Sequence, residues 1–185
     1  MVFSYYSRLT RAEQRIYRKS DEVSSILLPR ASSLHPRVGM LVGALKSEDR
    51  LRTEEICQEI VSAITASLKV PALRVEVLAA RPSRSWGELH GLYTPARRHR
   101  VARITVWMRT AQRRQVVAFR SFLRTLLHEI CHHLDYEFLR LGESFHTEGF
   151  YKRESSLFHQ MVPNQQGVAD QGTKSSPRRD SPGRQ

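Results

Sequence analysis

The feature that most constrains this chain of 185 residues is a pair of histidines one helical turn apart, inside a strongly helical stretch. Residues 116–139 carry apolar side chains at helical intervals, which predicts one long amphipathic helix. Within it the sequence reads His128-Glu129-Ile130-Cys131-His132, so the two imidazoles share one face and can reach one ion. The helix is therefore expected to carry a metal site.

Zinc suits this pair, because neutral imidazole nitrogens bind it well and a catalytic zinc uses three protein ligands with one position left for water. Glu129 directly follows the first histidine and is placed to accept a proton from that water. The pattern thus predicts His128 and His132 as metal ligands and Glu129 as the catalytic residue of a hydrolase.

The third ligand has to come from another element. The metzincin extension is excluded, because Asp135 and Phe138 stand where that class has glycine and histidine. His146 opens the next expected helix, which a short turn can fold back against the first, so we favour His146 as the third ligand. Glu148 or Glu154 from the same helix would instead make a His-His-Glu site.

Five other side chains have expected roles or places near this motif. Asp135 could orient a ligand histidine by accepting its second N–H. Tyr93 or Tyr136 could steady the oxyanion of the reaction. His133 is expected at the surface or behind a ligand, while Cys131 is expected to be a small packed residue and no zinc ligand.

The remaining periodicity predicts further elements. Helices are expected over 9–19, 47–68, 116–139 and 146–161, and short strands over 73–78, 89–93 and 102–108. Three strands in a row favour an antiparallel sheet. Pro29 and Pro36 argue against a helix between residues 28 and 39, so a flexible joint is expected there.

Arginine dominates the charge. Lys plus Arg number 30 against 18 Asp plus Glu, giving a formal net charge of +12, and 25 of the 30 are arginine. Between Glu88 and Glu129 no acidic residue occurs, whereas nine arginines do: Arg97, Arg98, Arg100, Arg103, Arg109, Arg113, Arg114, Arg120 and Arg124. This Arg97–Arg124 window is either a basic face for DNA or arginine spread over solvated surfaces.

A non-enzymatic, basic nucleic-acid-binding protein with a structural zinc is therefore the alternative function. Glu129 argues against it, since a structural site has no need of a carboxylate beside its ligand.

At the histidine motif the chain resembles the SprT-like zinc metallopeptidases. The matching stretch reads Leu126-Leu127-His128-Glu129-Ile130-Cys131-His132-His133, then His146-Thr-Glu-Gly-Phe150. The resemblance covers about residues 47–161 and implies that His146 supplies the third zinc ligand. It implies a zinc metalloendopeptidase acting on protein or peptide substrates, with DNA-associated proteins as one expected substrate class.

The expected fold is α+β, a minimal zincin with a long N-terminal helix, a small antiparallel sheet, the histidine-bearing helix and a ligand-bearing C-terminal helix. We expect an N-terminal helical extension and linker over 1–45, the peptidase domain over 46–162 and a disordered basic tail over 163–185. The chain has no apolar run of membrane-spanning length and only two cysteines. A cytoplasmic protein without a membrane partner is therefore expected.

Overall fold

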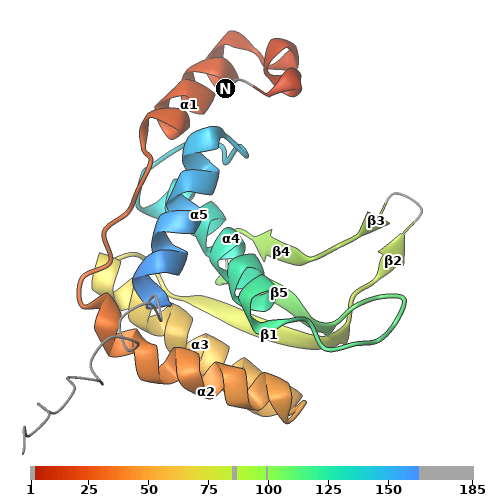
Figure 1. Ribbon diagram of the computed structural model, residues 1–185. Helices are drawn as coiled ribbons and strands as arrows, with labels where there is room; N and C mark the ends of the chain where they lie inside the picture. Colours follow the sequence, from red (N-terminus) through yellow and green to blue (C-terminus); the bar gives the residue numbers. More distant parts are fainter. Residues whose placement is uncertain (1–2, 85–86, 99, 163–185) are drawn as a thin grey trace, which may run out of the picture.

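The computed structural model describes residues 3–84, 87–98 and 100–162, which form a mixed α+β structure (Figure 1). The helices are η1 Ser4–Arg8, α1 Arg11–Glu22, η2 Ala31–Leu34, α2 His35–Lys46, α3 Arg50–Leu68, α4 Phe119–Glu137 and α5 Glu148–Met161. The strands are β1 Leu73–Ala80, β2 Ser83–Arg84, β3 Gly87–Glu88, β4 Gly91–Thr94 and β5 Ala102–Arg109. The α+β class is confirmed, and residues 163–185, expected to be disordered, lie outside the described residues.

Side-chain caps fix where three of the helices begin. Thr10 and Glu13 form the capping box that starts α1, and Asp49 accepts a backbone N–H at the start of α3. The hydroxyl of Thr147 accepts the backbone N–H of Phe150 at the start of α5. Because Thr147 directly follows His146, this cap also fixes the place of the third histidine.

The stretch between residues 28 and 39 is helical, so the flexible joint expected there is wrong. η2 leads directly into α2, and Pro36 stands in the first turn, where its missing N–H has no helical partner to lose. Leu34, Val38 and Leu41 are buried in the core. The residues before position 46 therefore contribute to the same core as the later elements.

The main sheet is mixed and not antiparallel as expected. Its strand order is β1-β5-β4, with β1 parallel to β5 and β4 antiparallel to β5. The chain leaves β1 through the separate β2–β3 ribbon, returns as β4, and only then inserts β5 between them. The chain passes through β2, β3 and β4 between β1 and β5. This long connection lets it return in the same direction, as a parallel pair requires.

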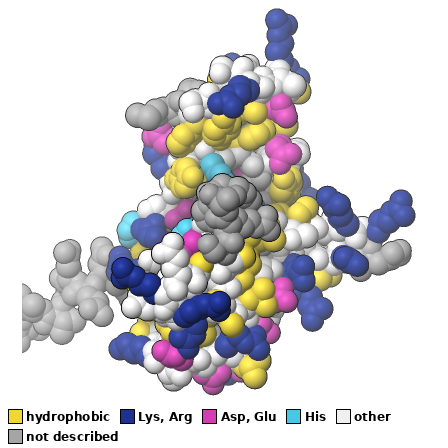
Figure 2. All heavy atoms as spheres, turned by 90° about the vertical axis from the view of Figure 1, so that its right-hand side faces the viewer, with side chains coloured by type: hydrophobic (Ala, Val, Ile, Leu, Met, Phe, Trp, Pro, Cys, Tyr) yellow, Lys and Arg dark blue, Asp and Glu magenta, His cyan; other side chains and the backbone are white. Residues whose placement is uncertain are grey.

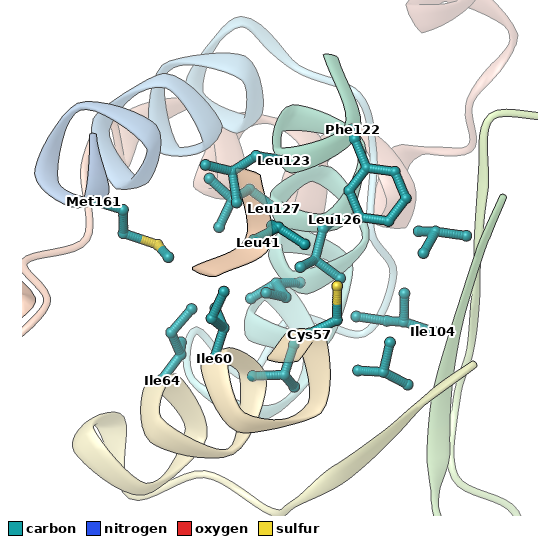
Figure 3. Packing of buried hydrophobic residues seen from close by; sticks show 14 of the residues in the cluster. Leu41, Cys57, Ile60, Ile64, Ile104, Phe122, Leu123, Leu126, Leu127 and Met161 are labelled. Atoms are coloured by element: carbon teal, nitrogen blue, oxygen red, sulfur yellow. The ribbon is translucent and has the colours of Figure 1, made fainter. Parts of the chain in front are cut away.

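The helices cover the sheet in successive layers (Figure 1). α3 packs on β1 and α4 on β4 and β5, while α2 packs on α3, α5 on α4, and α1 on α5. Figure 3 shows the shared core, in which Leu41, Ile60, Ile104, Leu126 and Met161 point toward one another from five different elements. The helix α4 is thus held between the sheet and α5. None of the described helices combines the length and apolar character needed to cross a bilayer.

Candidate metal centre

Three histidines meet on the side of α4 that faces the start of α5. His128 and His132 come from α4, and His146 from the residue before the cap of α5. The Nε2 atom of His146 lies 3.0 Å from Nε2 of His128 and 3.1 Å from Nε2 of His132. A tetrahedral zinc ion would hold its ligand nitrogens roughly 3.3 Å apart. The three histidines singled out from the sequence therefore lie close enough to bind one metal ion.

The other nitrogen of two of these rings is already engaged. His128 donates from Nδ1 to Oε2 of Glu154 at 3.1 Å. His132 donates from Nδ1 to the hydroxyl of Ser144 at 2.7 Å, because that hydroxyl gives its own hydrogen to Asp135. Both Nε2 atoms therefore carry a lone pair and no hydrogen. Lone pairs that point at one another repel unless a cation lies between them, so the arrangement suits a metal ion.

The pKa shifts favour the same protonation state. Burial, together with the neighbouring rings of His128 and His146, lowers the pKa of His132 to about 3. Burial and His128 also lower the pKa of His146. Both imidazoles are thus neutral at pH 7, which is the form that a metal ion requires.

A buried chain of polar groups supports His132 from behind. Ser144 donates to Oδ2 of Asp135 at 2.7 Å, and Arg153 donates to Oδ1 of Asp135 at 2.8 Å. The side chains of Asp135 and Arg153 are both 0% exposed. Arg153 also donates to the backbone oxygen and the hydroxyl of Ser20 in α1. Asp135 therefore supports His132 only indirectly, because Ser144, and not Asp135 as expected, accepts the Nδ1–H of His132.

The N-terminal segment also holds the backbone around His146. The hydroxyl of Tyr5 donates to the carbonyl oxygen of His146 at 3.0 Å. The backbone N–H of Gly149 donates to Oδ1 of Asp21 at 2.8 Å. A Cβ atom at Gly149 would lie 2.6 Å from the carbonyl oxygen of Asp21, so only glycine permits this close approach. The backbone around His146 is therefore held from two sides.

Glu129 lies beside the histidines and is only 6% exposed. Burial raises the pKa of Glu129 to about 7, against the lowering effects of His128 and of a backbone hydrogen bond from Tyr93. A Cβ atom at Gly91 of β4 would overlap the Glu129 carboxyl group, so the glycine makes room for it. A carboxyl group with a pKa near neutrality can both accept and release a proton.

These groups line one open pocket of about 660 Å³ between β4, α4 and the start of α5. The pocket wall contains all three histidines and Glu129, and on its other side Gly91 and Pro95. Histidine side chains are visible near the middle of the face shown in Figure 2. The arrangement leaves space for water and for part of a ligand beside the Nε2 atoms.

The two tyrosines proposed for the oxyanion already have partners. The hydroxyl of Tyr93 donates to Nδ1 of His133 at 3.1 Å, because Nε2 of that ring donates to the carbonyl of Pro71 at 2.8 Å. Tyr136 donates to Oε1 of Glu143 at 2.6 Å. His133 is buried behind the site, so its alternative placement at the surface is wrong.

The alternative ligands have other partners. Glu154 accepts from His128, and Glu148 pairs with Lys152 at 2.7 Å, so the described metal cluster contains histidines alone. Cys131 is fully buried, as expected. Sequence reasoning missed Ser144 and the contact between Glu154 and His128, because no local spacing pattern marks contacts between separate elements.

The arginines of the Arg97–Arg124 window lie in several different environments. Arg109 pairs with Glu48, and Arg124 pairs with Glu154 at 3.3 Å and stacks on an aromatic ring of α5. Arg97 lies in the turn between β4 and β5 and lines a separate pocket. On the face shown in Figure 2, basic side chains stand in separate groups with acidic and apolar side chains between them. DNA binding through the whole window stays a prediction.

Comparison of the chain with family models, with curated proteins and with solved structures gave no match.

Proposed function

We propose that this chain is a zinc-dependent peptidase in which His128, His132 and His146 hold the ion and Glu129 acts as general base. The observation that carries the proposal is the convergence of three Nε2 atoms beside a buried carboxyl group in one open pocket. Structural zinc sites are closed by four protein ligands, whereas catalytic ones use three. The three-histidine cluster of the described residues follows the catalytic pattern.

The donor set fits zinc. Three neutral imidazoles suit zinc and similar transition metals, whereas magnesium and calcium prefer oxygen ligands. Bound there, zinc would supply a Lewis acid that polarises a carbonyl group and lowers the pKa of a water molecule. Glu154 and Ser144 hold two of the imidazoles in the orientation that presents Nε2.

Glu129 supplies the proton chemistry. A cation on the histidines would favour its ionised form, which is the form that accepts a proton from the attacking water. Once protonated, the same carboxyl group would carry that proton to the amine that leaves.

The proposed substrate is a polypeptide in extended conformation. β4 forms the pocket wall opposite the histidines and is one of the two edge strands of the described three-stranded sheet. The outer edge of such a strand can pair with the backbone of an extended peptide. A peptide held along β4 would pass Glu129, which packs against Gly91 of that strand.

Metal analysis combined with a protease assay tests the proposal. We expect about one zinc per purified chain and hydrolysis of an unfolded protein or a fluorogenic peptide library. Glu129→Gln should keep the zinc and lower the rate by about 100-fold or more, because the amide cannot accept the proton. Glu55→Gln, an exposed glutamate on α3, is the matched control.

His128→Ala and His132→Ala should both lose the zinc. Full activity in Glu129→Gln would overturn the role of Glu129 in catalysis. A wild-type protein that holds zinc but hydrolyses none of these substrates would instead favour the non-enzymatic alternative.

A further inference from the structure

A second pocket, of about 620 Å³, adjoins the candidate metal centre at the end of β4. Four arginines line it: Arg74 of β1, Arg103 of β5, and Arg97 and Arg100 of the turn between β4 and β5. Pro95 lines this arginine pocket and also the histidine pocket, so the two share a wall. A single extended ligand could therefore occupy both.

The positive charge of the arginine pocket exceeds the negative charge of the acidic side chains around it. None of its lining residues is acidic. Arg74 and Arg103 stand opposite each other on neighbouring strands, where like charges repel. Arg103 has a carboxylate partner, Glu76 at 3.4 Å, whereas within the described part of the chain no acidic group pairs with the other three arginines. A bound anion would relieve this repulsion.

The position of the pocket favours an acidic peptide over a nucleic acid. A peptide that pairs with β4 beside Glu129 and Gly91 would continue along the strand toward Thr94 and Pro95, where the arginine pocket begins. Among the described residues, no aromatic ring in the lining offers a surface on which a base could stack. Carboxylates, by contrast, pair with guanidinium groups directly.

We propose that the arginine pocket binds acidic side chains of the substrate, roughly three to four residues from the scissile bond at about 3.3 Å per residue. The inference rests on the proposed function, because it takes the substrate to be a polypeptide. It assigns the preference of the enzyme for acidic sequences to Arg74, Arg97, Arg100 and Arg103.

Binding can be measured without hydrolysis. The zinc-loaded Glu129→Gln protein is titrated into a fluorescein-labelled peptide rich in Asp and Glu, and into the same peptide with Asn and Gln, at about 50 mM salt to limit screening. We expect clearly tighter binding of the acidic peptide. Adding Arg74→Glu and Arg100→Glu should weaken acidic-peptide binding by about tenfold or more, because two attractive contacts become repulsive.

The matched control reverses Arg11 and Arg15, two exposed arginines of α1 outside the pocket lining, and makes the same change in net charge. It should retain the preference. Equal binding of both peptides by the parent protein, or an unchanged preference in the Arg74→Glu/Arg100→Glu protein, would overturn the inference. Tighter binding of a single-stranded oligonucleotide, lost in the same double variant, would overturn it in favour of nucleic acid.

Hydrolysis by the wild-type protein separates this inference from the proposed function. Cleavage of acidic and neutral peptides at equal kcat/KM would overturn the assigned preference and leave the peptidase proposal intact. Absence of cleavage, together with acidic-peptide binding that the double variant loses, would overturn the peptidase proposal and support the arginine pocket as a binding site for acidic chains.

Discussion

At the scale of single residues, burial disfavours the charged forms of the proposed base Glu129 and of the proposed ligand His132. It raises the pKa of Glu129 and lowers the pKa of His132, because in each case the charged form loses its hydration. A cation held by the three histidines would favour the charged form of Glu129.

Glu129 gives the metal-free protein a pH dependence with a definite sign. Its pKa in the folded state, about 7, exceeds its ordinary value of 4.5. The folded state therefore binds the extra proton between these values, and its stability falls as pH rises through that range. After chelation, Glu129→Gln should be more stable than wild type by about 3 kcal/mol near pH 8 and by much less near pH 4.

Urea unfolding of both proteins at the two pH values measures this difference. An equal difference at both pH values would mean that Glu129 ionises normally in the folded state.

Ser144 is the residue through which the buried Asp135 and Arg153 support His132. Ser144→Ala leaves the Nδ1–H of His132 without its acceptor, so zinc affinity should fall by roughly 10- to 100-fold. Ser144→Thr keeps a hydroxyl and should restore most of the affinity. Competition with a chromophoric chelator measures the affinity, with Ser62→Ala on the exposed side of α3 as control. Unchanged affinity in Ser144→Ala would remove Ser144 from the metal centre.

At the scale of elements, the position of the start of α5 depends on how closely it packs against α1. Gly149 packs directly on the backbone of Ser20 and Asp21, whereas Gly43 in α2 has open space where a Cβ would lie. Gly149→Ala should destabilise the protein by about 2 kcal/mol through overpacking. Gly43→Ala should stabilise it by about 0.5–1 kcal/mol, because alanine favours a helix.

Chemical denaturation of these two variants is the measurement, and zinc affinity is the second readout. Gly149→Ala should also weaken zinc binding, since it moves the segment that carries His146. A change of stability in the same direction in both glycine variants would contradict the close packing of Gly149 against α1.

At the scale of the whole molecule, a metal that joins α4 to the start of α5 should stabilise the fold. Free zinc at 100 times its Kd adds about 2.7 kcal/mol, which corresponds to a Tm increase of roughly 5–10 °C for a chain of this size. Differential scanning calorimetry with and without a chelator measures the increase. Magnesium should give no increase, and His128→Ala should abolish the effect of zinc.

The sequence by itself determined the features that depend on neighbours within one element. The periodicity of residues 116–139 predicted α4, and the four-residue spacing of His128 and His132 placed both rings on one face. Periodicity likewise predicted a helix over residues 9–19, where the structure has α1. These predictions succeed because helical period, caps and turn-to-turn spacing are local properties of the backbone.

Only the tertiary structure decided which residues from different elements come into contact. The order of strands around β5, the hydrogen bond between His128 and Glu154, and the chain from His132 through Ser144 to Asp135 all join residues that no spacing rule connects. The arginine pocket likewise gathers Arg74 with arginines more than twenty positions later in the chain. Such contacts follow from how helices and strands pack to bury their apolar faces, and packing is a property of the whole chain.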